Sequence, residues 1–265
     1  MQGAIRGSNQ VCLLVFFTIV FVLSAHAATF SNASLQGSYA FLGGRWTADV
    51  NSPQGGVAGV LTFDGVGSFT EIYSGMVNGS PVSATITGTY AVNPNGTGTV
   101  TFSSGWQWPI VLNSTSAKIA HGIQLLLVTN LGMNEVGTST ALLQSSTPKT
   151  YTLANVKGNF SFQSDEWTAN PSQPIYARNG LFTFDGKGNV QGSSSYMEGG
   201  GTLQTETFTG TYTVTSNGMG TISLSRGTQY VFVLHTATGT VANGLQIVQT
   251  NTTANIAICG IAERQ

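Results

Sequence analysis

The sequence predicts an all-β protein made of two tandem antiparallel meander β-barrels of about eight strands each, preceded by a signal peptide. The first observation behind this prediction is an internal duplication, in which residues 61–67 (LTFDGVG) return 121 positions later as residues 182–188 (FTFDGKG). The second is that no long window after the N-terminal segment places apolar residues at helical spacing, whereas glycine and β-branched residues recur throughout. The third is a set of Asp-Gly and Asn-Gly pairs between apolar runs, which are typical of hairpin turns.

Residues 1–27 have the pattern of a signal peptide. Arg6 supplies the positive start, residues 11–23 supply an apolar stretch, and residues 25–27 (AHA) form a small-x-small cleavage site. We therefore expect the mature chain to begin near Ala28 and to act outside the cytoplasm, either secreted or periplasmic, with no membrane span after cleavage. An uncleaved anchor is the alternative.

The duplication divides the rest of the chain into two domains. The first β-barrel repeat is expected at 29–144 and the second at 151–265, with a polar, proline-containing linker at 145–150. Each copy carries eight apolar or alternating runs that read as strands. In the first copy these lie near 37–47, 57–64, 68–76, 82–93, 97–103, 108–114, 122–130 and 137–144. In the second copy they lie near 158–168, 178–185, 189–197, 203–215, 219–225, 229–236, 244–250 and 254–262.

The turns between these runs predict the topology. Asp-Gly pairs at 64–65 and 185–186, followed by Asn-Gly pairs at 95–96 and 217–218, indicate consecutive hairpins with both turn residues at positive φ. A meander of eight strands can hide both of its edges by closing on itself, which favours a barrel over an open sheet.

Strand parity indicates what fills each barrel. Leu61 and Phe63 share a face, as do Tyr39 and Phe41, and such side chains can fill an eight-stranded barrel or surround one small ligand. Residues 125–128 are apolar on both faces, so we expect the neighbouring copy to cover that strand from outside.

Composition excludes some functions. Only 7% of the residues are charged, against about a quarter in an ordinary domain. Removal of Arg6 with the signal peptide leaves 8 basic and 10 acidic residues, so the mature net charge is −2. Because no basic face exists to neutralise phosphates, binding to nucleic acid is not expected. Cys259 is the one cysteine after the signal peptide, so no disulfide within the mature chain is expected, and flanking apolar residues indicate a buried thiol.

The motifs G-x-Y/F-x-F, F-D-G-x-G, G-T-Y-x-V and G-x-G-T resemble a class of secreted bacterial tandem β-repeat proteins of unknown function. In the first copy they are carried by Gly37, Tyr39, Phe41, 63–67, 88–92 and 96–99. The pattern is also similar to barrels of the allene oxide cyclase type in the lipocalin-like group, and this resemblance implies a barrel. It rests on turn and strand residues, and no catalytic motif of the cyclases is matched, so it implies no active site.

No metal or cofactor site is expected. The two histidines of the mature chain, His121 and His235, are not repeated between the copies and have no H-x-H spacing. A single Asp in each F-D-G-x-G turn supplies too few oxygen ligands for calcium. G-x-S-x-G is also absent from the sequence.

Glu71 is the weak candidate for a catalytic residue, together with Tyr73 on the same strand face. A carboxylate inside an apolar barrel would have a raised pKa suited to acid or base chemistry. The second copy has Gly192 at this position, and we expect Glu71 to be a solvent-facing strand residue.

Tryptophans are the candidates for ligand binding. Trp46 and Trp167 are repeated at equivalent positions, where a structural role is expected, whereas Trp106 and Trp108 occur in the first copy alone, with Tyr230 at the position of Trp108. Trp106 follows the turn at 103–105 and is expected to be exposed, where it would contact a glycan or another protein.

These observations do not assign a function, and three hypotheses remain open. The leading one is a non-catalytic surface or extracellular binding module that contacts a glycan or a cell surface through loops and aromatic side chains. The second is a carrier of a small apolar ligand in a barrel interior. The third is an allene oxide cyclase-like isomerase that uses Glu71 beside Tyr73.

Overall fold

The computed structural model describes residues 29–47, 55–77, 79–116, 118–128, 135–145, 149–168, 176–199, 201–238, 240–251 and 256–265. The expected signal peptide at 1–27 lies outside these residues, as do residues 146–148 of the expected linker.

The regular secondary structure of the described chain is β-strand, apart from two short 3-10 helices, η1 (Asn32–Ser34) and η2 (Leu153–Asn155), one before each group of strands. The first group is β1 (Gln36–Thr47), β2 (Gly55–Asp64), β3 (Ser68–Val77), β4 (Ser80–Val92), β5 (Thr97–Phe102), β6 (Gln107–Ser116), β7 (Ile119–Val128) and β8 (Glu135–Ser145). The second group is β9 (Lys157–Thr168), β10 (Tyr176–Asp185), β11 (Asn189–Glu198), β12 (Gln204–Val214), β13 (Met219–Leu224), β14 (Gln229–Thr238), β15 (Val241–Gln249) and β16 (Ile256–Arg264).

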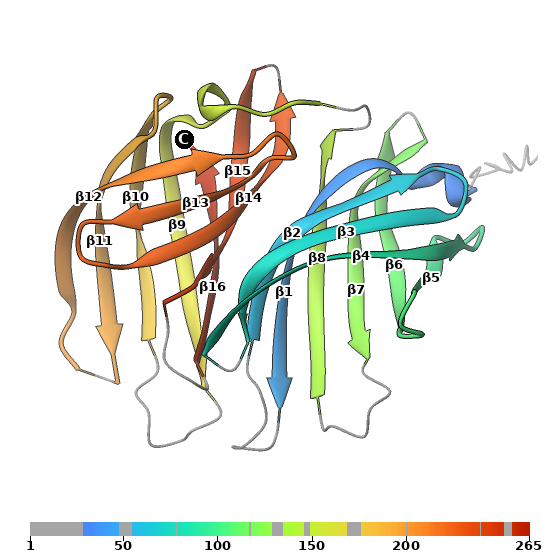
Figure 1. The fold of residues 1–265 in the computed structure, drawn as a ribbon, viewed down its shortest axis with the longest axis horizontal. Helices are drawn as coiled ribbons and strands as arrows, with labels where there is room; N and C mark the ends of the chain where they lie inside the picture. The colour runs from blue at the N-terminus through green and yellow to red at the C-terminus, as the bar shows by residue number, and fades with distance from the viewer. Residues whose placement is uncertain are drawn as a thin grey trace, which may run out of the picture.

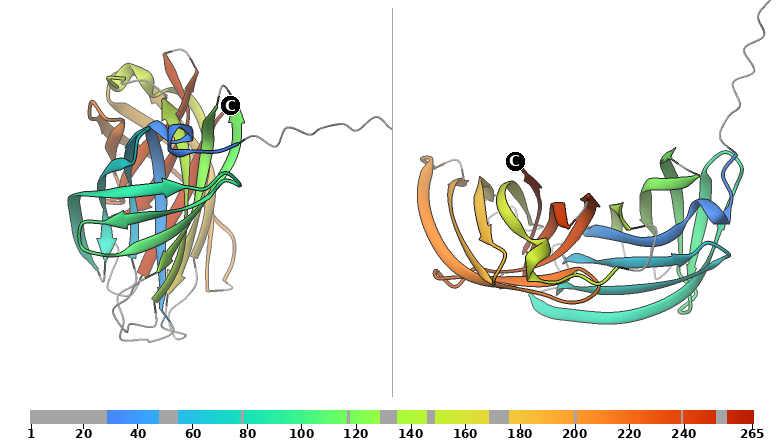
Figure 2. Two further views of the ribbon diagram at one scale, coloured as in Figure 1. Left: turned by 90° about the vertical axis from the view of Figure 1, so that its right-hand side faces the viewer. Right: turned by 90° about the horizontal axis from the view of Figure 1, so that it is seen from above.

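Each group forms a closed antiparallel barrel in which every strand pairs with its neighbours in sequence (Figure 1). β1 closes the first barrel by pairing with β8, and β9 closes the second by pairing with β16. The predicted fold, two meander barrels of eight strands, is confirmed. The two barrels lie side by side, and the view from above shows the strands of each curving around its own interior (Figure 2).

Aromatic side chains line the two interiors, because alternate residues of every strand point inward. Phe63 is at the centre of the first group of rings, with its ring centroid 5.6 Å from that of Tyr39 and 5.0 Å from that of Tyr90. Phe184 repeats this arrangement in the second barrel, with Tyr212 at 5.0 Å. The inward parity that the sequence predicts is therefore the observed one.

The 3-10 helices are held by the same tyrosine in both copies. The Tyr90 hydroxyl donates a hydrogen bond to the Leu35 carbonyl oxygen at 3.0 Å, just after η1. In the second barrel the Tyr212 hydroxyl donates to the carbonyl oxygen of Val156 at 2.9 Å, just after η2. Leu35 and Val156 are fully buried, so each 3-10 segment adds an apolar side chain to its barrel core.

The Asp-Gly turns differ from the prediction in their backbone. Gly65 and Gly186 have φ of +78° and +77°, but among the described residues Lys118 is the one non-glycine residue at positive φ, so Asp64 and Asp185 are not left-handed. Instead, the carboxylate Oδ1 of Asp64 accepts hydrogen bonds from the backbone N–H groups of residues 66, 67 and 68 at 2.8–3.0 Å. The aspartate thus shapes a three-residue loop through its side chain.

Small side chains on the outer face of β1 and β2 form the contact between the barrels. Ala40, Ala58 and Val60 pack there against Val233 and Val248 of the second barrel. Because alanine leaves the backbone accessible, the two walls approach closely. Gln144 at the end of β8 also reaches across, and its Nε2 donates to the Leu234 carbonyl oxygen at 2.6 Å.

The expectation that residues 125–128 of β7 are covered by the second copy is wrong. Leu126 is 42% exposed on the outer wall of the first barrel. Leu125 and Leu127, which point inward, are buried.

Candidate functional site

The first barrel contains an interior cavity of about 60 Å³. It lies toward the end of the barrel where β2 begins and β3 ends, at Gly55 and Val77, away from η1. A volume of this size is several times the ~10–15 Å³ that one water needs. The lining residues are Phe41, Gly43, Gly55, Val57, Glu71, Tyr73, Val77, Ile86, Phe102, Trp106, Trp108, Leu127 and Ser139.

Glu71 is the one carboxylate among the described residues that line this cavity. It is 3% exposed, because it shares the inward face of β3 with Phe69. The expectation of a solvent-facing Glu71 is therefore wrong. Tyr73, two residues further along the strand, is half-buried and lines the same cavity. The structure thus brings the two weak catalytic candidates together at one wall.

Trp108 forms the opposite, aromatic part of the lining. It is 8% exposed, and its ring centroid lies 4.4 Å from that of Phe102 at an interplanar angle of 65°. Its indole Nε1 is buried and has no hydrogen-bond acceptor among the described residues. A buried donor without a partner costs free energy and commonly marks the place of a water or a ligand.

The other three tryptophans lie in different places. Trp106 is half-buried, packs against the core of the first barrel and lines the cavity, so it is less exposed than expected. Trp46 and Trp167 belong to β1 and β9, where their backbones pair with Val136 and Ala257. Their side chains lie outside the part of the chain that the structure describes.

The second barrel distributes side-chain volume differently at the equivalent positions. Phe208 stands where the first barrel has Ile86, and Gly192 stands where it has Glu71. These residues are cross-strand partners in both copies, Glu71 with Ile86 and Gly192 with Phe208. The Phe208 ring therefore occupies the space above a glycine, and it is buried in the aromatic core.

Arg178 is the other main difference, since its equivalent in the first barrel is Val57. Arg178 forms an ion pair with Glu206 at 3.0 Å, and both side chains are nearly buried, at 10% and 7% exposure. It also lies beside Tyr230, the equivalent of Trp108, and forms a hydrogen bond to it. In the first barrel Val57 stands in place of this arginine, so Trp108, the equivalent of Tyr230, has no arginine at that position as a hydrogen-bond partner.

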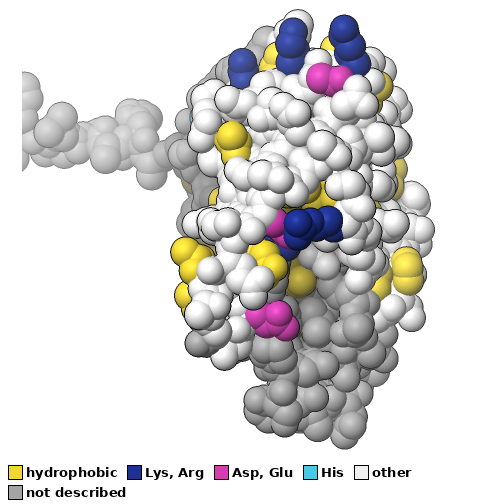
Figure 3. All heavy atoms as spheres, turned by 90° about the vertical axis from the view of Figure 1, so that its left-hand side faces the viewer, with side chains coloured by type: hydrophobic (Ala, Val, Ile, Leu, Met, Phe, Trp, Pro, Cys, Tyr) yellow, Lys and Arg dark blue, Asp and Glu magenta, His cyan; other side chains and the backbone are white. Residues whose placement is uncertain are grey.

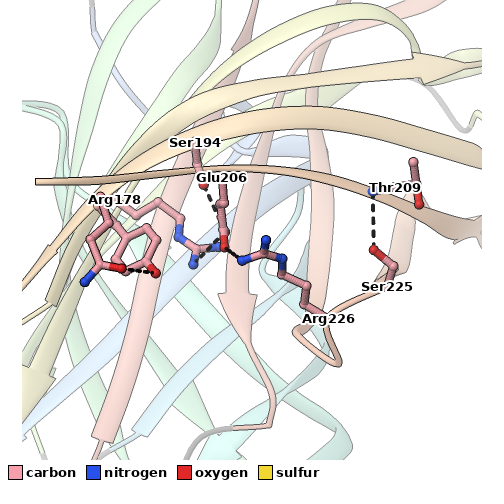
Figure 4. A network of polar contacts seen from close by, with 8 residues as sticks. Arg178, Ser194, Glu206, Thr209, Ser225 and Arg226 are labelled. Atoms are coloured by element: carbon pink, nitrogen blue, oxygen red, sulfur yellow. Dashed lines mark hydrogen bonds and ion pairs between the residues drawn. The ribbon is translucent and has the colours of Figure 1, made fainter.

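Glu206 joins three strands and a turn in the second barrel. Its carboxylate binds Arg178 of β10, accepts a hydrogen bond from the Ser194 hydroxyl of β11 at 3.1 Å, and pairs with Arg226 of the β13–β14 turn at 2.7 Å (Figure 4). On this face of the molecule, basic and acidic side chains meet in the middle of a largely uncharged surface (Figure 3). A single buried carboxylate thus fixes four segments.

The histidines and the cysteine form no site of their own. Among the described residues no group of three or more His, Cys, Asp or Glu side chains is close enough to hold a metal. His235 is buried, with Nε2 3.2 Å from Glu263 Oε1, and burial lowers its pKa to about 4. His121 lies on the outer face of β7. Cys259 lies at the contact between the barrels, against Gly56.

A second, open depression lies between the two barrels and measures about 460 Å³. Thr138, Thr140 and Leu142 of β8 line one side, and Asp165 and Glu263 are on the other. Its described lining contains no aromatic side chain, so it lacks the stacking surface that the surface-binding hypothesis requires.

Comparisons with known proteins add little to this geometry. No protein-family model and no curated protein matches the chain. A crystal structure of a protein with unknown function from the DUF3598 family of Nostoc punctiforme is similar at 12% sequence identity, covering 88% of this chain and 97% of that one, with a TM-score of 0.27. Among the described residues, no helix has the length and apolar character needed to cross a membrane.

Proposed function

We propose that the first barrel binds a small, mainly apolar molecule in its interior cavity, without chemical conversion. The observation that carries this proposal is the contrast between the two copies. In the second barrel Phe208 and Arg178 fill the equivalent region, whereas the first barrel keeps a cavity there, lined by Ile86 and Val57. An apolar cavity lined by a few polar groups is typical of a small-molecule site.

The polar groups of the cavity define the kind of ligand. The Trp108 Nε1–H is a donor without an acceptor among the described residues, and Glu71 supplies carboxylate oxygens at the other side of the lining. The aromatic rings of Phe41, Phe102 and Trp106 form the apolar part. We therefore propose a ligand with a small ring or short alkyl group that carries one hydroxyl or carbonyl group. Because the cavity measures about 60 Å³, well below the ~150 Å³ of a cavity that holds benzene, a ligand with an aromatic ring leaves part of that ring at the opening.

The proposed setting is outside the cytoplasm, in a secreted or periplasmic protein. It is supported by the apolar segment at 11–23 with its small-x-small site, and by the low charge content of 7%. The resemblance to secreted bacterial tandem β-repeat proteins points the same way.

Binding of phenol, with toluene as the probe of equal size that lacks the hydroxyl, tests the proposal. We expect phenol to shift the indole N–H resonance of Trp108 and to bind at least tenfold more tightly than toluene. Glu71→Gly with Ile86→Phe, which installs the glycine and the ring that the second barrel has at Gly192 and Phe208, is expected to abolish binding. Glu71→Gly with Thr85→Phe places the same ring on the outer face of β4 and is the matched control. If these two double variants bind phenol equally well, the ligand does not enter the barrel.

The isomerase hypothesis gains one observation, since Glu71 does line an interior cavity beside Tyr73. The two side chains would then move a proton on the bound ligand. In that case Glu71→Gln would retain phenol binding, and exchange of the ligand's carbon-bound hydrogens with solvent, followed by NMR, would require Glu71. A protein that binds phenol or its carbonyl analogue acetophenone without such exchange is a binding protein only.

A further inference from the structure

The wall of the first barrel is incomplete beside the cavity. β4 pairs with β3 along its length, but within the described residues it pairs with β5 only over 88–92. The β5–β6 hairpin is shorter than its neighbours, and its turn is tied to β4 by a hydrogen bond from the Ser103 N–H to the Thr87 carbonyl oxygen at 2.9 Å. On the far side, the ladder between β6 and β7 ends at the pair Ile110–Leu125, next to Pro109, which has no backbone N–H to donate.

The cavity extends to this place in the wall. Ile86 lies at the end of the part of β4 that does not pair with β5, and it lines the cavity. Leu127, beyond the end of the β6–β7 ladder, lines the cavity too. Trp106 lies between them at the end of the turn, half-buried, and its carbonyl oxygen accepts a hydrogen bond from the Phe102 N–H at 2.8 Å. The indole ring is therefore both part of the cavity lining and part of the outer surface.

The second barrel has the same gap and closes it with an ion pair. Within the described residues β12 pairs with β13 only over 210–214. Glu206 therefore lies on the part of β12 that does not pair with β13. Arg226 lies in the β13–β14 turn, and its Nη1 is 2.7 Å from Glu206 Oε2, so the pair spans the gap (Figure 4). On the other side, the β14–β15 ladder continues to Tyr230–Gln249, two pairs further than in the first barrel.

The equivalent positions in the first barrel hold Ala84 and Ser104. Ala84 has the inward parity of Ile86, and the turn containing Ser104 has the same geometry as its twin, with Gly105 at φ +89° and Gly227 at φ +87°. Ser103 and Ser225 donate the same backbone hydrogen bond, to Thr87 and Thr209. The first barrel thus repeats the backbone of this turn but has no equivalent of the Glu206–Arg226 ion pair at Ala84 and Ser104.

We propose that ligands enter the first barrel through this lateral window between β4 and the β5–β6 turn, with Trp106 as its gate, and that the second barrel is the same design held shut by Glu206 and Arg226. The inference rests on the proposed function, since it concerns the route to the cavity. It predicts that closing the window changes the rates of binding far more than the affinity, because neither Ala84 nor Ser104 lines the cavity.

The test transfers the closing pair into the first barrel as Ala84→Glu with Ser104→Arg. Association and dissociation of phenol are measured by NMR line-shape analysis of the indole N–H signals in the full protein. We expect both rates to fall at least tenfold with the dissociation constant changed less than threefold. Each single substitution is the control, since one charge alone forms no pair and is expected to leave both rates within threefold of the parent.

A second variant keeps the proposal falsifiable if the double variant fails to fold. Trp106→Ala removes the gate and is expected to raise the association rate and the dissociation rate at least tenfold each, because loss of a ligand contact alone would raise only the dissociation rate. Unchanged rates in the folded double variant, or in Trp106→Ala, would overturn the window while leaving the binding site in place. Absence of phenol binding to the parent protein would instead contradict the proposed function itself.

Discussion

The ring of Phe208 lies across the backbone of Gly192, its partner on the neighbouring strand, and a Cβ atom on the glycine would come within 2.7 Å of that ring. In the first barrel the same pair of positions holds Ile86 and Glu71. The exchange is coupled, because a phenylalanine at one position needs a glycine at the other. Loss of the ring in the first barrel makes room both for a carboxylate and for a cavity.

Gly192→Ala is therefore expected to destabilise the second barrel. The added methyl group would also meet the carbonyl oxygen of Leu181, so the ring and the backbone must both shift. Overpacking of this kind costs about 1–3 kcal/mol of unfolding free energy. Urea denaturation measures the change, with Gly201→Ala in the β11–β12 loop as control. Equal stabilities of the two variants would show that Phe208 has room to move.

Glu206→Gln is expected to be the most destabilising single change in the charged cluster. It leaves the Arg178 guanidinium nearly buried without its carboxylate partner, and breaking a buried pair in this way costs about 3–5 kcal/mol. Arg226→Ala is the matched comparison, because Arg226 is 58% exposed and an exposed ion pair contributes only about 0–1 kcal/mol.

Replacing both buried partners separates charge from packing. The double variant Arg178→Met with Glu206→Leu removes both charges and keeps apolar volume, so its free energy of unfolding is expected to lie above that of Glu206→Gln. If Glu206→Gln and Arg226→Ala lower the denaturation midpoint equally, Glu206 does not act as the buried centre of the cluster.

Most of the fold follows from sequence signals that act locally. The duplicated FDG turns and the alternation around Phe63 and Phe184 locate strands and inner faces, because turn chemistry and side-chain period are properties of a few neighbouring residues. The closed barrels follow from consecutive hairpins without a crossover. The side-chain role of Asp64 in its turn was missed, since Asp-Gly pairs serve more than one loop length.

The site was predicted less well, because it depends on comparison between positions that are distant in sequence. Glu71 shares the parity of Phe69, which is a signal for the interior, but the general preference of carboxylates for solvent points the other way. The cavity depends on Ile86 and Val57 being smaller than their twins Phe208 and Arg178. The barrel contact depends on which outer faces meet, and outward alanines at 40 and 58 were its only sign in the sequence.

Acid sensitivity below pH 4 is expected from the two aspartate turns. Backbone N–H groups hold the pKa of Asp64 at about 2, and the Asn189 side-chain amide with backbone N–H groups does the same for Asp185. A pKa lowered in the folded state stabilises the protein above the unfolded value, near 4. That contribution is lost as the pH falls from about 4 to about 2.

Thermal denaturation across this pH range tests the prediction. The double variant Asp64→Asn with Asp185→Asn is expected to show a flatter dependence of melting temperature on pH between about 4 and about 2 than the parent. Asp165→Asn removes an exposed carboxylate from β9 and serves as the charge control. Parallel curves for the parent and the double variant would contradict the assignment of this acid transition to the turns.

The Cys259 thiol is expected to report on the contact between the barrels. It lies so close to Gly56 that a Cβ atom there would be 2.5 Å from Sγ, and burial raises the pKa of the thiol to about 12. The thiolate is the form that reacts with iodoacetamide, so the folded protein is expected to resist alkylation at pH 8, and the urea-unfolded protein to react.

Gly56→Val forces the two walls apart at Cys259 and Val248, and is expected to speed alkylation of the folded protein at least tenfold. Gly201→Val, away from the contact, is the control, and peptide mapping by mass spectrometry distinguishes Cys259 from Cys12. Equal labelling rates of Cys259 in the folded parent protein and in Gly56→Val would show that the reagent reaches the thiol through the open depression that Cys259 lines, without separation of the walls.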